Sequence, residues 1–203
     1  IDVRDDNLEM FYASLAPLNS QGGNDLFVAW RTSATTPWSL ANAANMGKYI
    51  NTTGNEDDPT ITADGLELYW ASPARPEGGS GTASIYRVTR PSTSSAWSTI
   101  VTYVKELDST FQDHSPSISP DGLSMIFSST RVGTGSDLYM ATRPGIGTSF
   151  SVPVPVKELN SVGGWDHNGQ WSGDGFSYYY TQNATNDIWR ADRILPMCLF
   201  SAN

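Results

Sequence analysis

The stretch DHSPSISPDGLSMIFSSTRVGTGSDLYMATR, residues Asp113–Arg143, contains a small β-sheet module in sequence order. Two runs of strand-forming residues flank the turn Pro120–Gly122, in which proline presets φ and glycine accepts a positive φ. A glycine-containing loop then leads to a third run, Asp137–Arg143. We therefore predict three antiparallel strands, followed by a looser fourth strand near 152–156, where two prolines restrict pairing to a sheet edge.

The same module is present four times, at intervals of about 55 residues, which is typical of a repeat protein. Its turn recurs at Asp6-Asn7, Asp64-Gly65, Asp121-Gly122 and Asp174-Gly175. Each third strand ends at an arginine, and these closing arginines are Arg31, Arg90, Arg143 and Arg193. An aromatic residue follows each arginine at the same offset, at Trp38, Trp97, Phe150 and Phe200. We predict that the closing arginines are structural, pairing with carboxylates or stacking on aromatic rings between modules.

One such module is a small sheet that is apolar on both faces, so it cannot bury them alone. Radial stacking of the modules buries each face against the next, which is the architecture of a β-propeller. A β-sandwich of duplicated hairpins is the alternative, but it gives no reason for the constant arginine and aromatic offsets. We predict an all-β protein with one propeller domain over 1–203, whose blade repeats are about 1–55, 56–112, 113–165 and 166–203. The four repeats form either a small four-bladed ring or part of a larger propeller.

The motif P-x-I-S-P-D-G-L-x-M-x-F-x-S-x-R, followed by D-L-Y-x-A-T-R, is carried by Pro116–Arg143. It resembles the TolB-type propeller repeat, a relative of the WD repeat, and the resemblance covers nearly the whole chain. The first copy lacks the proline of the motif and has Asn7 in place of glycine, and the second has Ser84 in place of aspartate. The fourth copy has Gly169 and Gly173 in place of the two prolines. The resemblance implies a β-propeller in an extracellular or periplasmic setting, and it implies no particular activity.

The composition excludes several classes of function. The 203 residues include 21 acidic and 12 basic residues, for a net charge of −9, which argues against a nucleic-acid partner. No apolar run approaches the roughly 20 residues of a membrane-spanning helix. The only cysteine, Cys198, allows neither an internal disulfide nor a cysteine metal cluster, and we interpret it as a small buried hydrophobe.

Candidate functional residues precede the first strand of three modules, at Glu56-Asp57-Asp58, Asp113-His114 and Asp166-His167. In a propeller, the loops that lead into the innermost strands lie at one mouth of the central channel. We therefore expect the carboxylates of Glu56, Asp113 and Asp166 to converge around the axis, with both histidines beside them.

Three interpretations of these residues remain open. The carboxylates could accept backbone N–H bonds and fix the leading loops, which is a structural role. Asp113, His114, Asp166 and His167 could instead hold a cation, Ca²⁺ through carboxylates alone or a transition metal such as Zn²⁺ or Mn²⁺ with histidine. In a catalytic interpretation, Glu56, Asp113 and Asp166 supply an acid–base pair, which requires two carboxyl groups about 5–10 Å apart.

For ligand binding, the candidates are Asp57, His114, His167 and Trp165, since the indole of Trp165 precedes Asp166 and can stack on a sugar or peptide. The favoured prediction is an exported, non-catalytic module that binds a protein or glycan through loops at the channel mouth. It is favoured because no polar cluster breaks the repeat symmetry, as enzyme sites do. A carbohydrate-active hydrolase or lyase, and a structural subunit of an extracellular assembly, are the alternatives.

Overall fold

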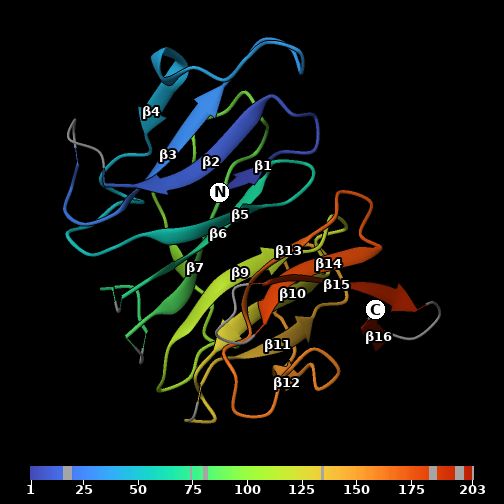
Figure 1. The fold of residues 1–203 in the computed structure, drawn as a ribbon. Helices are drawn as coiled ribbons and strands as arrows, with labels where there is room; N and C mark the ends of the chain where they lie inside the picture. Colours follow the sequence, from blue (N-terminus) through green and yellow to red (C-terminus); the bar gives the residue numbers. More distant parts are fainter. Residues whose placement is uncertain are drawn as a thin grey trace.

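The computed structural model describes residues 1–15, 20–73, 75–79, 82–133, 135–182, 187–194 and 199–202, so Cys198 lies outside the described part. Within these ranges, four antiparallel sheets of four strands follow one another along the chain (Figure 1). Blade 1 contains β1 (Asp2–Val3), β2 (Glu9–Ser14), β3 (Asp25–Trp30) and β4 (Ala43–Asn45). Blade 2 contains β5 (Asp57–Ile61), β6 (Glu67–Ser72), β7 (Ser84–Thr89) and β8 (Thr102–Tyr103).

Blade 3 contains β9 (Asp113–Ile118), β10 (Ser124–Ser129), β11 (Asp137–Thr142) and β12 (Val154–Pro155). Blade 4 contains β13 (His167–Trp171), β14 (Ser177–Gln182), β15 (Asp187–Ile194) and β16 (Leu199–Ala202). A single 3-10 turn, η1 (Leu40–Asn42), interrupts the β-structure of the described residues. None of the helical structure described here is long and apolar enough to cross a membrane.

The hairpin turns have the predicted conformation. The residue after each turn aspartate has a positive φ, namely 59° at Asn7, 72° at Gly65, 69° at Gly122 and 70° at Gly175. Each turn aspartate also accepts a hydrogen bond from the backbone N–H two residues later, as Asp121 Oδ1 does from Leu123 at 2.9 Å. These Asx turns fix the register of the two strands that they connect, so a local sequence signal sets the blade geometry.

Apolar side chains join successive blades. In the described residues, three buried clusters connect blades 1 and 2, blades 2 and 3, and blades 3 and 4. Their large members include Phe11 and Trp70 in the first cluster, Tyr69 and Phe127 in the second, and Ile126 and Tyr178 in the third. Both faces of blade 2 and both faces of blade 3 are thereby buried. The chain folds as a β-propeller of four blades, which confirms the predicted fold class, and its sheets do not form the two layers of a sandwich.

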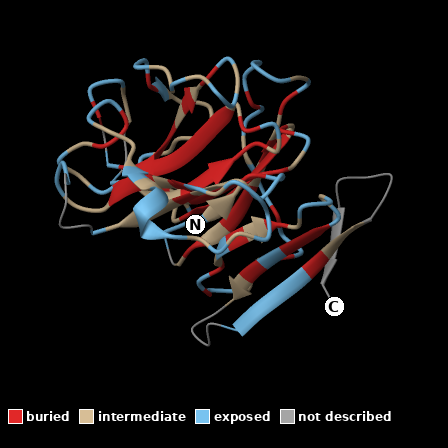
Figure 2. Cartoon of the chain, turned by 90° about the horizontal axis from the view of Figure 1, so that it is seen from above, coloured by how far each residue is buried: buried red, intermediate tan, exposed pale blue. Residues whose placement is uncertain are grey.

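The seam between blades 4 and 1 is built differently. Tyr179 and Ile188 correspond in the repeat to the buried Tyr69 and Ile85 of blade 2, yet they are 41% and 78% exposed. Figure 2 shows the first half of β15, close to the C-terminal end of the chain, as exposed. Among the described residues, no buried apolar cluster joins blade 4 to blade 1. Polar contacts near the axis make this connection instead.

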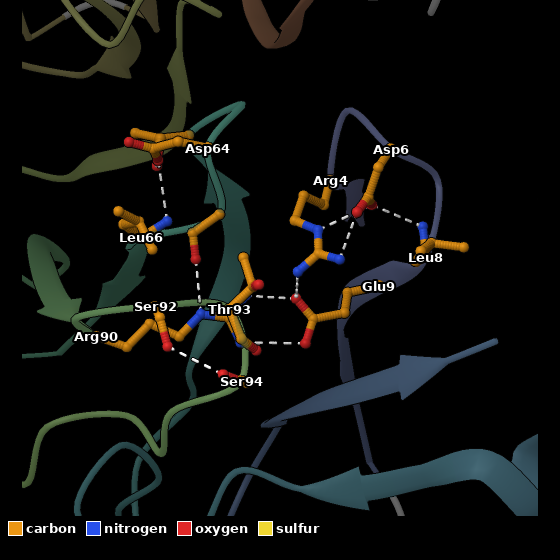
Figure 3. Close-up of polar contacts among 12 residues, drawn as sticks. Arg4, Asp6, Leu8, Glu9, Asp64, Leu66, Arg90, Ser92, Thr93 and Ser94 are labelled. Carbon is orange, nitrogen blue, oxygen red and sulfur yellow. Dashed lines mark hydrogen bonds and ion pairs between the residues drawn. The ribbon is translucent and has the colours of Figure 1, made fainter. Parts of the chain in front are cut away.

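The closing arginines have the predicted structural role. Arg90 donates to Glu9 of blade 1, which also accepts from Arg4, and Figure 3 shows this network. Arg143 pairs in the same way with Glu67 of blade 2. The guanidinium carbons lie over the predicted aromatic rings, 4.3 Å from the ring centroid for Arg31 on Trp38, 4.4 Å for Arg90 on Trp97 and 4.9 Å for Arg143 on Phe150. The fourth aromatic residue, Phe200, pairs with Arg193 in the β15–β16 register, but its side chain is outside the described part.

Candidate functional site

The carboxylate of Asp113 is fully buried and is held inside its own blade. Its Oδ2 atom accepts a hydrogen bond from the backbone N–H of Ser109 at 2.6 Å. Its Oδ1 atom accepts from Ser129 Oγ at 2.6 Å and from Arg131 Nη2 at 2.7 Å. These bonds tie the loop before β9 to the end of β10, so the carboxylate fixes the path by which the chain reaches the inner strand.

Glu56 and Asp166 are equally buried and make equivalent contacts. Glu56 accepts from the backbone N–H of Thr52 at 2.8 Å and from Ser72 Oγ at 2.9 Å. Asp166 accepts from the backbone N–H of Ser161 at 2.6 Å. The three carboxylates therefore bind the loops that lead into their blades, and Glu56 and Asp113 also bind a serine of the second strand. Their contacts support the loop-fixing interpretation, and a catalytic role for them stays a prediction.

Three other residues from equivalent positions meet at the axis. Asp58, Ser115 and Asn168 lie at β-bulges in β5, β9 and β13, and each has a positive φ of 53°, 48° and 52°. Ser115 Oγ lies 3.0 Å from both Asp58 Oδ2 and Asn168 Oδ1, and the Ser115 backbone N–H donates to Asp58 at 3.1 Å. We call the end of the channel around these three residues the leading mouth.

A belt of hydrogen bonds, the axial belt, lies deeper in the channel and consists of Asp2, Thr60, Ser117 and Gln170. Asp2 Oδ2 accepts from the backbone N–H of Ile61 at 2.9 Å. Thr60 and Ser117 accept in the same way from the next inner strand, each at 3.2 Å. Gln170 Nε2 donates to Asp2 Oδ1 at 3.0 Å, which closes the belt across the seam between blades 4 and 1.

Two polar side chains predicted as ligands border the leading mouth. A cavity of about 330 Å³ is lined by Asp58, Ser115 and Asn168, and Asp58 also lines a second cavity of about 370 Å³ together with Asp57 and His114. Burial lowers the pKa of His114, the charge of His167 lowers it further, and the carboxylates of Asp58 and Asp113 oppose this shift. Burial raises the pKa of Asp57, although the hydrogen bond from Asn24 Nδ2 at 2.7 Å opposes the shift. The mouth is therefore a polar pocket with a neutral imidazole beside carboxylates.

Trp165 lies in the loop that leads into β13, and His167 is the first residue of that strand. The side chain of Trp165 is 52% exposed, so its indole is available for stacking. His167 Nδ1 lies 3.1 Å from the backbone oxygen of Trp165. The structure thus brings Asp58 and His114 together. It also places His167 near enough to lower the pKa of His114.

The metal site that the sequence left open stays a prediction, and its candidate carboxylates are engaged in internal hydrogen bonds. The Asp113 and Asp166 oxygens already accept internal hydrogen bonds, which leaves the imidazoles of His114 and His167 without these carboxylate partners. In the part of the chain that the structure describes, no group of three or more His, Cys, Asp or Glu side chains is arranged to hold a metal ion.

Sequence reasoning included Asp58 among the candidate residues but missed Ser115 and Asn168, which meet it at the axis. Asp58, Ser115 and Asn168 stand at one repeat position, and aspartate and asparagine tolerate a positive φ better than most residues. The tolerance of Asp58 and Asn168 for a positive φ was the feature of the sequence that could have indicated a bulge. Asp2 carried no comparable signal, because its role depends on contacts with blades 2 and 4 that are distant in sequence.

Comparisons with known proteins agree with the fold. TolB from Acinetobacter baumannii superposes with a TM-score of 0.61 at 14% identity, over 99% of this chain and 42% of that chain. A protein assigned as TolB from Agrobacterium tumefaciens gives 0.60 at 13% identity, over 98% and 62%. Trypanosoma rangeli sialidase, in complex with the inhibitor DANA, gives 0.58 at 9% identity, over 99% and 37%. No protein-family model and no curated protein sequence matches the chain.

The fold is therefore a TolB-like β-propeller. At these identities the likeness shows the fold alone, since one framework accommodates both TolB and a sialidase. The chain spans about two fifths and three fifths of the length of the two TolB chains.

Proposed function

We propose that the protein is an exported, non-catalytic propeller module that binds a protein or a glycan at the leading mouth. One observation carries this proposal. The three candidate catalytic carboxylates are fully buried and hydrogen-bonded to the loops before their blades, whereas Asp57, Asp58 and His114 line an open cavity. The accessible groups can accept hydrogen bonds from a ligand, and none of the three carboxylates that the sequence suggested for glycoside hydrolysis is among them.

The leading mouth offers two kinds of contact to a ligand. Carboxylates and a neutral imidazole accept hydrogen bonds from hydroxyl or ammonium groups. The half-exposed indole of Trp165 supplies an apolar face on which a sugar ring or a peptide side chain can stack. A concave site with a few polar groups and one aromatic edge is typical of binding sites in propellers and other folds.

The proposed setting is extracellular or periplasmic, and a larger assembly is compatible with it. Support comes from the TolB-like fold and from the acidic composition, which keeps an exported protein soluble. A partner that docks at the leading mouth would join the propeller to other components without a membrane-spanning helix in the described part of the chain.

Array binding with the purified protein tests this function. Glycan and peptide arrays identify a ligand, and titration then compares the wild type with Asp58→Asn and Trp165→Ala. Asparagine tolerates the positive φ at position 58, so the first variant removes charge and keeps the backbone. We expect at least tenfold weaker binding in both variants, which corresponds to about 1.4 kcal/mol.

The matched control is Glu158→Gln, because Glu158 is an exposed acid in the loop between blades 3 and 4. It should bind as the wild type does. Turnover of a bound glycan that disappears in Asp113→Asn would replace the binding function with the carbohydrate-active alternative. Failure of the wild type to bind either array would contradict the proposal directly.

A further inference from the structure

A separate cavity, of about 250 Å³, lies between blades 2 and 3 and shares no residue with the leading mouth. Blade 2 contributes Arg87 on β7 and Lys105 after β8. Blade 3 contributes the loop 147–149 and Phe150, whose ring packs edge-on against Tyr69. The cavity therefore combines basic side chains, hydroxyl groups and aromatic rings from two neighbouring blades.

The guanidinium of Arg87 is incompletely paired. Its Nη1 atom donates to Glu67 Oε1 at 3.2 Å. Its Nε atom is buried and has no hydrogen-bond partner among the described residues. Glu67 cannot supply that partner with its other oxygen, because Oε2 already accepts from Tyr69 and Arg143. A buried, charged donor without an acceptor is costly, which points to an acceptor that arrives from outside the chain.

The repeat shows which acceptor suits an arginine at this position. The equivalent residues are Val28 in blade 1, Met140 in blade 3 and Arg190 in blade 4. Arg190 binds the carboxylate of Asp192 through two bonds, Nε to Oδ1 at 2.8 Å and Nη2 to Oδ2 at 3.0 Å. Blade 2 has Thr89 two residues after its arginine, so the corresponding carboxylate is missing. Arg87 thus presents the edge that Arg190 uses, but without a partner in its own strand.

The local charge favours an anion although the whole protein is acidic. The charged residues that line the cavity are Arg87, Lys105 and Glu106. Lys105 is exposed and has no ion pair in the described part of the chain. Glu67 is not part of the lining and pairs with both Arg87 and Arg143. Its single negative charge is therefore smaller than the two positive charges of these arginines. This excess of positive charge stands out in a chain with a net charge of −9.

We propose that this cavity binds a small organic carboxylate. The ligand carboxylate enters from the cavity, and the Arg87 side chain, which is 22% exposed, turns its Nε edge toward it to form the two-bond geometry that Asp192 shows on Arg190. Lys105 adds a second positive charge, and Ser149 lies in the lining as a hydroxyl donor. The rings of Tyr103 and Phe150 provide an apolar wall for the remainder of the ligand.

Calorimetric titration with benzoate and glucuronate tests the site, with benzamide as the neutral counterpart of benzoate. The wild type should bind at least one of the two carboxylates saturably and should not bind benzamide. Arg87→Met should weaken this binding at least tenfold. The matched control is Arg190→Met, which changes the equivalent arginine of blade 4 and should alter the affinity less than twofold.

A stability measurement separates a ligand site from a structural arginine. Because Glu67 keeps its ion pair with Arg143 and Met140 occupies the same repeat position in blade 3, Arg87→Met should leave the melting temperature unchanged or raise it. A drop of several degrees would assign Arg87 a structural role and contradict the proposal. Equal binding of benzamide, unchanged affinity in Arg87→Met, or no saturable binding of either carboxylate would also overturn it.

Discussion

Arg90 of blade 2 donates a hydrogen bond from Nη1 to Glu9 Oε1 of blade 1, across 3.1 Å. The same guanidinium lies over the ring of Trp97, whose edge packs against Phe11 of blade 1. One side chain thereby couples the end of its own blade to both a carboxylate and an apolar cluster of the preceding blade. This coupling is the reason that the arginine and aromatic offsets stay constant in the sequence.

Glu9→Gln should destabilise the protein by about 3 kcal/mol, because it leaves the buried guanidinium of Arg90 without its charged partner. Urea unfolding followed by tryptophan fluorescence measures the change. The control is Asp6→Asn, which alters an exposed acid that also pairs with Arg4 and should cost less than about 1 kcal/mol. Equal losses of unfolding free energy in the two variants would show that the Glu9–Arg90 contact between blades adds no stability of its own.

Asp113→Asn should lower the free energy of unfolding by about 3–5 kcal/mol, since the fully buried carboxylate accepts bonds from Ser109, Ser129 and Arg131. Chemical denaturation checks this value. Ligand affinity per folded molecule should remain at the wild-type level, because the carboxylate does not line the leading mouth. A variant that keeps its stability and loses binding would show that Asp113 acts on the ligand.

The pH dependence of stability should contain a contribution from His114. Burial lowers the pKa of His114 in the folded protein, so the unfolded chain takes up this proton at a higher pH. Stability is therefore complete above the ordinary pKa of about 6.5 and is lost as the pH falls through the lowered value. Unfolding curves recorded between pH 7.5 and about 5 measure how the free energy of unfolding changes with pH.

His114→Gln should flatten that slope, and an NMR titration of the imidazole should show the lowered pKa directly. The groups that act on His114 are Asp58 and Asp113, which raise its pKa, and His167, which lowers it. An unchanged slope in His114→Gln would assign the acid sensitivity to other groups.

Gly122→Ala should destabilise blade 3 by about 1–2 kcal/mol, because its φ of +69° disfavours any residue with a Cβ atom. The new methyl group would also lie 2.5 Å from Ile146 Cδ1, so that side chain must move. The matched change is Asn7→Gly at the same turn position of blade 1, where φ is 59°. Thermal unfolding should show little loss, or a small gain, for Asn7→Gly and a clear loss for Gly122→Ala.

The sequence predicted the blades well because their signals are local. The turn at Asp121-Gly122 and the strand after it lie within one hairpin, and Arg90 and Trp97 both lie in the short segment between β7 and β8. The orientation of Asp113 was harder to predict. A β-bulge at Ser115 changes which residues face the axis, so Ser115 and not Asp113 meets the other blades there.

The remaining features depend on contacts between blades. Asp2 has four hydrogen bonds, to residues of three blades, and no pattern near residue 2 indicates them. The unpaired edge of Arg87 is visible only by comparison with Arg190 and its neighbour Asp192. A repeat comparison that looks for charged residues without their usual partner could find such positions in advance.

The unequal joints between blades also set where the ring would first come apart. Buried apolar clusters hold the three interfaces between consecutive blades. At the interface between blades 4 and 1, Gln170 donates a hydrogen bond to the carboxylate of Asp2. Thermal fluctuations should therefore unzip blade 4 from blade 1 before they disturb the middle of the molecule. The amide protons of β6 and β10 should then exchange most slowly, and those of β15 should exchange early.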